Sequence, residues 1–279
     1  MRIQVITDSS TNVPDAYLAR LKIIELPALV NFGAESFLNK VELSAEEFYR
    51  RLAAADKLPT TAQPSPKQFA AAYEQAAAAG LEEAIVVVVS GKMSGTLNSA
   101  VVAAENAPLK VHMWDSMNAA MGAGWQAIAA AEMAHAGRDS AAILAELAAI
   151  RARMSTYTTP ATLRNLMASG RAPRLKGSIG ELLDIKPVLA MVDGTLDPVG
   201  QARGRRKALA AIVDRTVEAL GDRPARVAVA HANALAEAER LAETVRGRLN
   251  VAELVITELG PVLATLAGPG IMAVCAYTV

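Results

Sequence analysis

The sequence predicts an α/β protein built from two different domains, and three observations support this. In the first half, short apolar runs that end in polar residues alternate with alanine-rich helical segments, which is typical of a layered sheet. After about residue 150 the alternation gives way to a hairpin signal, and 279 residues suffice for two ordinary domains. We therefore expect a three-layer domain with a parallel sheet over residues 1–155 and a mixed-sheet domain over residues 156–279.

The strands expected in the first domain are apolar on both faces. Such runs favour parallel strands that helices cover on both sides. The segments are "RIQVITD" (2–8), "EEAIVVVVS" (82–90) and "LKVHMWDS" (109–116).

The helices expected between these strands carry recognisable start signals. Ser44 and Glu47 have the spacing of a capping box before "AEEFYRRLAAA". Ser65 and Gln68 repeat that spacing, with Pro66 at the first helical position. Helices are therefore expected from these two serines onwards.

The second half contains a hairpin signal followed by another alternation of strand and helix. Asp193 and Gly194 lie between "KPVLAMV" and "TLDPVGQAR", which predicts a two-residue turn between antiparallel strands. Further strands are expected at "ARVAVAH" (225–231), "AELVITEL" (252–259) and "GIMAVCAYTV" (270–279), with a helix at 234–249. A mixed sheet follows from this order.

The composition argues against several classes of function. The formal net charge is zero, so no strongly basic nucleic-acid surface is expected. The single cysteine, Cys275, lies in an apolar run and has no partner for a disulfide. The chain starts without a secretory signal and contains no apolar run of transmembrane length, so we expect a cytoplasmic protein.

Polar residues, almost all neutral hydroxyls, follow several of the expected strands. In open parallel sheets, ligands bind beyond the carboxyl ends of the strands. Serine and threonine also cap helices and close turns, which is the simpler explanation for any one segment. The recurrence of this pattern favours a ligand site at the segments Thr7–Ser9, Thr60–Gln63, Ser90–Thr96 and Asp115–Ser116.

A hydrolase or acyltransferase that uses Ser94 or Ser116 with His231 is the alternative function. The segment "GKMSG" lacks the G-x-S-x-G spacing of a nucleophile elbow. The chain has three histidines, and His231, at the end of an apolar strand, is the best candidate for a general base.

Cofactor and metal sites find little support in the sequence. The segment "SGKMSGT" lacks the order of a phosphate-binding loop. "GAGWQA" (122–127) fits a dinucleotide fingerprint, but it is expected inside a helix. The histidines are scattered and no paired-cysteine spacing occurs, so we expect neither a cofactor nor a metal.

A set of motifs in order along nearly the whole chain resembles the DegV family of bacterial fatty-acid-binding proteins. They are "ITDSS", "TTAQPSP", "MSGTLNSA", "WDSMNAAMGAGW", "LRNLMASGR", "DGTLDPVGQARGRRKAL" and "LAGPGIMAV". The resemblance implies two α/β domains with one long-chain fatty acid in a tunnel between them. It also implies a non-enzymatic carrier in phospholipid metabolism, which presents its lipid to a separate ATP-dependent fatty acid kinase.

The resemblance also implies which residues hold the ligand. Thr61 and Ser94 would bind the carboxylate, with donors from Gly95 and Thr96 nearby. If Gly95 opens a helix, the free N–H groups at its start would attract an anion. Leu266 occupies the position of a histidine that the family commonly has before its terminal G-P-G. The polar network is therefore expected to be thinner here.

Two basic segments are candidate docking surfaces. In "ASGRAPRLKG", which includes Lys176, and "QARGRRKAL", the resemblance singles out Arg171 and Arg203 as contacts to a kinase or, transiently, to an anionic membrane. A solvated helix end is the alternative explanation for these residues. Gln201 stands where the family often has lysine.

Overall fold

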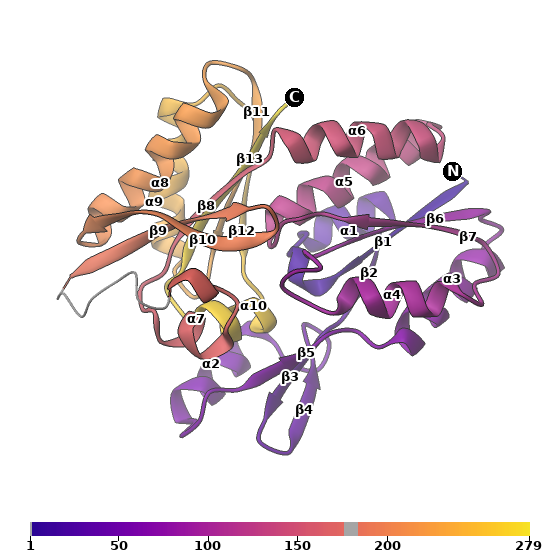
Figure 1. The fold of residues 1–279 in the computed structure, drawn as a ribbon, viewed down its shortest axis with the longest axis horizontal. Coiled ribbons are helices and arrows are strands. Elements are labelled where there is room, and N and C mark those ends of the chain that lie inside the picture. The colour runs from indigo at the N-terminus through magenta and orange to yellow at the C-terminus, as the bar shows by residue number, and fades with distance from the viewer. Residues whose placement is uncertain (1, 176–183) are drawn as a thin grey trace.

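The computed structural model describes residues 2–175 and 184–279, which form two lobes side by side and a smaller sheet beneath them (Figure 1). The first lobe contains a parallel four-stranded sheet with strand order β2-β1-β6-β7. Its strands are β1 (Ile3–Asp8), β2 (Ile24–Leu26), β6 (Glu83–Val88) and β7 (Lys110–Asp115). Its helices are η1 (Ser9–Thr11), α1 (Asp15–Leu21), α3 (Pro66–Ala78), α4 (Thr96–Ala104), α5 (Met121–His135) and α6 (Ser140–Ala152).

Helices cover both faces of this sheet, which confirms the three-layer prediction. Ile3 and Val5 of β1 belong to a core shared with α1, α5 and α6. Ile6, one position further, lies in a separate core with α3 and α4. The alternation along one strand thus places α1, α5 and α6 on one face and α3 and α4 on the other.

The second lobe contains a mixed six-stranded sheet with strand order β10-β9-β8-β13-β11-β12. Its strands are β8 (Ser155–Thr159), β9 (Ile185–Val192), β10 (Thr195–Arg203), β11 (Ala225–His231), β12 (Val251–Glu258) and β13 (Met272–Thr278). Its helices are α7 (Arg164–Ser169), η2 (Pro173–Leu175), α8 (Arg205–Leu220), α9 (Leu235–Arg248) and α10 (Pro261–Ala267). Only β11 and β12 pair in parallel within this sheet as described, so the mixed sheet is confirmed, whereas the boundary at residues 155–156 stays a prediction.

A third sheet, antiparallel and three-stranded, was not expected from the sequence. It has the order β4-β3-β5, with β3 (Leu29–Phe32), β4 (Glu35–Leu38) and β5 (Thr60–Ala62), and α2 (Ala45–Ala54) lies beside it. Phe32 and Phe48 pack with ring centroids 6.0 Å apart and join the sheet to α2. Its strands are too short to show a reliable alternation, which explains why the sequence did not reveal them.

The predicted hairpin forms as expected and also contacts the first lobe. Val192 pairs with Thr195, and the two turn residues Asp193 and Gly194 have φ values of 47° and 79°, as a type I′ turn requires. Ser90 Oγ donates to the carbonyl of Gly194 at 2.7 Å. The β9–β10 turn is therefore attached to the end of β6.

Helix α5 is buried between the two lobes. Twelve of its fifteen residues are buried, so it is apolar on all sides, as expected for a helix enclosed by protein. "GAGWQA" lies within it, and a Cβ at Gly122 would meet Asn118 Oδ1 at 2.0 Å and Thr156 Oγ1 at 2.5 Å. The absence of a side chain at Gly122 therefore permits close packing of α5 against Thr156 of the second lobe. Among the described helices, none has the length and apolarity needed to cross a membrane.

Candidate functional site

A pocket that is lined in part by hydroxyl and amide groups, called the polar pocket below, lies where the ends of β1, β5 and β6 meet α10. Three of the residues that the resemblance assigns to a carboxylate, Thr61, Ser94 and Thr96, line it together. The remaining lining residues are Ser10, Ala28, Ala62, Gln63, Val89, Met93, Ala119, Arg171, Val262, Leu263 and Leu266. Two of the four expected polar segments, Thr60–Gln63 and Ser90–Thr96, thus contribute to the pocket, whereas no residue of Thr7–Ser9 or Asp115–Ser116 lines it.

The start of α4 contributes the hydroxyls of Ser94 and Thr96. Their oxygens lie 2.8 Å apart, and the backbone N–H of Thr96 donates to Ser94 Oγ at 3.3 Å. The N-cap residue is Gly95, which has no side chain to cap the helix, so other donors of the first helical turn remain available for a polar ligand. This geometry suits an acceptor group.

Gly95 itself does not line the pocket. A Cβ at this position would meet Gln63 Nε2 at 2.9 Å, so the absence of a side chain leaves room for the Gln63 amide. Gln63 does line the pocket, and the sequence pattern had placed it in the expected segment Thr60–Gln63, although the family resemblance did not assign it to the ligand. Its place in "TTAQPSP", two residues after Thr61, was the available signal.

A second pocket, almost entirely apolar, adjoins the polar one. It measures about 570 Å³ including its open mouth and lies between the six-stranded sheet, α7 and α10. Five residues line both pockets: Met93, Ala119, Arg171, Leu263 and Leu266. The other lining residues are Ala120, Thr156, Thr158, Leu166, Met191, Leu196, Leu259, Ala267, Ile271 and Ala273.

The two threonine hydroxyls in the apolar pocket are engaged elsewhere. Thr156 donates to Asn118 Oδ1 at 2.9 Å, and Thr158 donates to the carbonyl of Met272 at 2.8 Å. Because both hydroxyl protons are used within the protein, this pocket presents few polar groups and suits an alkyl chain.

Leu266 lies on α10 at the junction of the two pockets. Its neighbour Thr265 is buried and donates to the carbonyl of Pro261 at 2.8 Å, which holds that hydroxyl in the helix. At the position where the family commonly has histidine, the pocket wall is therefore apolar.

The structure separates the two arginines expected at a docking surface. Arg171 follows α7 and lines both pockets, and its guanidinium donates to the carbonyl of Ser169, the last residue of that helix. Arg203 is exposed at the end of β10 and does not line the described parts of either pocket. Lys176 lies outside the described residues. Contact of Arg171 and Arg203 with a partner stays a prediction.

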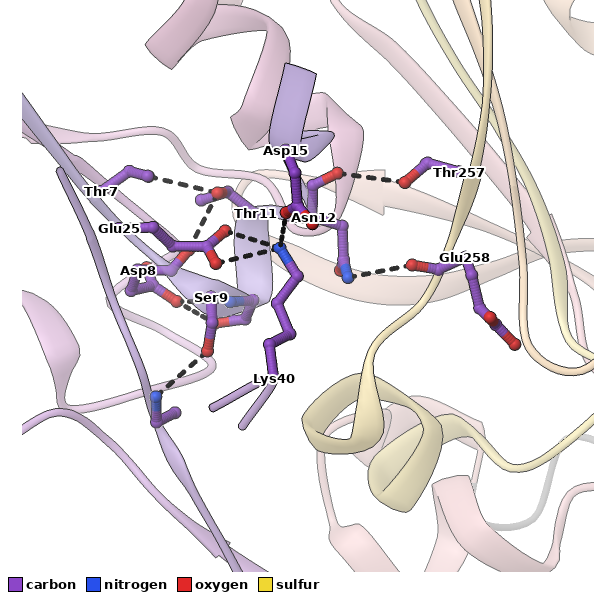
Figure 2. A network of polar contacts seen from close by, with 12 residues as sticks. Thr7, Asp8, Ser9, Thr11, Asn12, Asp15, Glu25, Lys40, Thr257 and Glu258 are labelled. Carbon is purple, nitrogen blue, oxygen red and sulfur yellow. Dashed lines mark hydrogen bonds and ion pairs between the residues drawn. The ribbon is translucent and has the colours of Figure 1, made fainter. Parts of the chain in front are cut away.

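A buried polar network holds the loop after β1 in place (Figure 2). Ser9 Oγ accepts from the backbone N–H of Ala28 at 3.1 Å, and Thr257 of the second lobe donates to the carbonyl of Asn12 at 3.2 Å. The loop is thus fixed to β12 and to the segment that enters β3.

Lys40 adds an ion pair to the same network (Figure 2). Its Nζ lies 3.0 Å from Glu25 Oε2 and 3.2 Å from Asp15 Oδ1. Burial raises the pKa of the Glu25 carboxyl, although Lys40 acts in the opposite direction. The pair joins β2, α1 and the loop after β4 around the base of the site.

The proposed hydrolase residues are not in contact. His231 is buried, its Nδ1 accepts from the backbone N–H of Ala234 at 3.3 Å, and burial lowers its pKa. Ser116 Oγ donates to the carbonyl of Asn118 at 3.2 Å. His112 contacts Glu83, and His135 contacts the carbonyl of Leu21. Within residues 2–175 and 184–279, no serine hydroxyl is hydrogen-bonded to a histidine ring.

Known proteins resemble this chain over its whole length. The model of the family described as "Uncharacterised protein, DegV family" matches residues 2–279. A DegV domain-containing protein of Halalkalibacterium halodurans is 31% identical over 278 residues, which is 99% of this chain and 98% of that protein.

Solved structures show the same fold. A DegV family protein from Thermus thermophilus, described for its fatty acid binding, is 31% identical and aligns over 100% of both chains with a TM-score of 0.92. DegV of Bacillus subtilis, a fatty acid binding protein, is 29% identical and aligns over 100% of both chains with a TM-score of 0.91. By the match of the family model and by this identity to its relatives, the chain belongs to the DegV family.

Proposed function

We propose that this protein binds one long-chain fatty acid in a continuous tunnel between its lobes. The observation that carries the proposal is the contact of two chemically different pockets, a polar one with Thr61 and Ser94 and an apolar one beside it. They share five lining residues, so a single amphipathic molecule can occupy both. The fatty acid binding described for the Thermus thermophilus and Bacillus subtilis proteins supports this assignment.

The polar pocket receives the carboxylate. Ser94, Thr96 and the first turn of α4 offer neutral donors, and Arg171 supplies a cation at the shared wall. With Leu266 in place of the usual histidine, these groups carry the recognition of the head group.

The alkyl chain supplies most of the affinity. Burial of a methylene contributes about 0.8 kcal/mol, so about a dozen contribute roughly 10 kcal/mol before the costs of association. Each hydrogen bond to the head group contributes only about 0.5–1.5 kcal/mol. The head-group residues therefore fix orientation, whereas the shape of the apolar pocket selects the chain.

The protein acts as a carrier and needs no cofactor. Presentation of the carboxylate to a separate ATP-dependent fatty acid kinase uses Arg171 near the pocket and the exposed Arg203. Arg203, Arg206 and Lys207 form an exposed basic group at the start of α8, which suits an acidic partner surface. The hydrolase alternative gains no support, because Ser94 and Ser116 lack a histidine partner among the described residues. The cytoplasmic location stays a prediction.

Displacement of a fluorescent fatty acid tests the head-group assignment. We expect the double variant Ser94→Ala and Thr61→Val to bind roughly tenfold more weakly, because two hydrogen bonds together contribute about 1–3 kcal/mol. Ser99→Ala, a buried serine of α4 outside the pocket lining, is the matched control and should bind as the wild type does. Unchanged affinity of the double variant would remove these hydroxyls from the site.

A further inference from the structure

Ser10 is a further residue of the polar pocket, and it is tied to a fully buried carboxylate. It lies in η1 directly after β1, is 7% exposed and lines the pocket. Its hydroxyl donates to Asp8 Oδ1, and its backbone N–H donates to the same oxygen at 2.9 Å. The backbone N–H of Val89 donates to Asp8 Oδ2 at 3.0 Å. Asp8 is 0% exposed, so Ser10 is its hydroxyl link to the pocket.

A carboxylate in this pocket and the oxygen of Ser10 would both act as hydrogen-bond acceptors, with no proton between them. A serine hydroxyl has one proton and two acceptor lone pairs, whereas an ionised carboxylate only accepts. Because Ser10 gives its proton to Asp8, its oxygen presents lone pairs to the pocket. A fatty acid carboxylate beside Ser10 would then face another acceptor.

One added proton resolves the conflict in either of two arrangements. In the first, the fatty acid binds as the neutral acid and donates to Ser10 Oγ, while Asp8 stays ionised. In the second, Asp8 is protonated and donates to Ser10 Oγ, and the Ser10 hydroxyl donates to the carboxylate. Both arrangements contain the same number of protons, so they are one thermodynamic state of the complex.

We propose that binding of a fatty acid takes up one proton, which is held in a chain of hydrogen bonds from Asp8 through Ser10 to the head group. The proposal rests on the proposed function and deepens it. Ser10 touches the ligand, and Asp8 is a positioning residue that acts through Ser10.

The surroundings of Asp8 favour proton uptake. Burial raises the pKa of the Asp8 carboxyl, although the hydrogen bonds from Ser10 and Val89 act in the opposite direction. On β2, the neighbouring acid Glu25 is paired with Lys40, which leaves that cation engaged away from Asp8. Other charged groups of the described residues around the site include Asp15 on α1, Asp115 at the end of β7, Glu258 at the end of β12 and Arg171 after α7. Arg171 favours an ionised head group and thereby places the added proton on Asp8.

Titration calorimetry in two buffers of different ionisation enthalpy measures the proton directly. The probes are dodecanoate and 1-dodecanol, studied at pH 7.5 and 8.5. We expect wild-type protein to take up about one proton with dodecanoate, and its affinity to fall about tenfold per pH unit. The alcohol donates to Ser10 without titrating, so its binding should take up no proton and should not depend on pH.

Two variants test the path of the proton. Ser10→Ala keeps both backbone hydrogen bonds to Asp8, and its uptake with dodecanoate should fall close to zero. Asp8→Asn removes the titrating carboxyl, although its amide NH2 would face the backbone N–H of Ser10 or of Val89, and it should bind dodecanoate with the same affinity at both pH values. Ser9→Ala removes the adjacent hydroxyl, which does not line the pocket, and should keep the uptake of one proton.

The outcomes separate this proposal from the proposed function. Binding of dodecanoate to wild-type protein without proton uptake, or full uptake by Ser10→Ala, would overturn the proton chain and leave fatty acid binding intact. If Asp8→Asn does not fold, Ser10→Ala still decides the question. Failure of wild-type protein to bind either probe would overturn both proposals.

Discussion

Ala119 lies at the junction of the polar and apolar pockets, so a large side chain at this position should close the passage between them. Ala119→Phe is the perturbation. Ala119 is partly exposed, and its backbone hydrogen bonds to Asn118 and Gly122 do not depend on its side chain. The substitution should therefore leave the fold intact while it blocks entry of an alkyl chain.

The magnitude follows from the burial of the alkyl chain. If the ring keeps only about four methylenes out of the apolar pocket, the loss is about 3 kcal/mol at about 0.8 kcal/mol each. That free energy corresponds to a roughly 200-fold larger dissociation constant. Exclusion of the whole chain would abolish measurable binding.

Displacement of a fluorescent fatty acid measures the affinity, and a thermal melt monitors folding. Ala136→Phe is the control, because Ala136 is exposed at the end of α5 and outside both pockets. We expect the control to bind normally. A well-folded Ala119→Phe protein with wild-type affinity would refute the continuity of the two pockets.

Three further predictions concern stability. Gly194→Ala should lower the free energy of unfolding more than Gly137→Ala does. The angle φ is near +78° at both sites, but only at Gly194 would a Cβ meet another atom, Ser90 Oγ at 2.7 Å. Urea unfolding compares the two variants, and equal losses would contradict this contact. Arg226→Met removes two ion pairs, to Glu132 at 2.6 Å and to Glu253 at 2.8 Å, and should cost about 1–3 kcal/mol of stability. An unchanged melting temperature would argue against a contribution from these pairs. Burial lowers the pKa of His231 in the folded state below 6.5. The contribution of neutral His231 to the free energy of unfolding is therefore present above pH 6.5 and is lost as the pH falls. His231→Gln should therefore lose less stability than wild type between pH 7.5 and 5.5 in urea titrations, and an identical loss would contradict the assignment.

Local signals in the sequence were sufficient for much of the fold. The strands β1 and β6 are buried on both faces, so their apolar runs were unambiguous, and β7 at the sheet edge was recognised although it is mostly half-buried. Asp193 and Gly194 form a turn whose φ values those residues favour, and the hairpin follows from that local preference. The Ser65–Gln68 capping box forms with both of its hydrogen bonds for the same reason.

The small β4-β3-β5 sheet was missed because its stability is not local. Its strands contain three or four residues, and the contact of Phe32 with Phe48 on α2 joins parts of the chain that no short window compares. This sheet positions Thr61, so the sequence pattern marked that residue only as part of the polar segment Thr60–Gln63, and the family resemblance singled it out as a ligand residue.

In the candidate site, too, some residues were recognisable from short sequence motifs, whereas others became evident only from contacts in the folded chain. Thr61, Ser94 and Leu266 were named from motifs, and the structure brings them to one pocket. Ser10 looks like an ordinary turn serine in "TDSST", and only its contact with a buried Asp8 distinguishes it. Arg171 was assigned to a docking surface because a sequence does not show which way a long side chain points.

Native mass spectrometry of freshly purified protein, followed by solvent extraction, tests the central claim most directly. We expect a mass increment that matches one long-chain fatty acid per chain, which organic extraction removes and which Ala119→Phe lacks. Protein that carries no lipid and takes up none from an excess of added oleate would contradict the account.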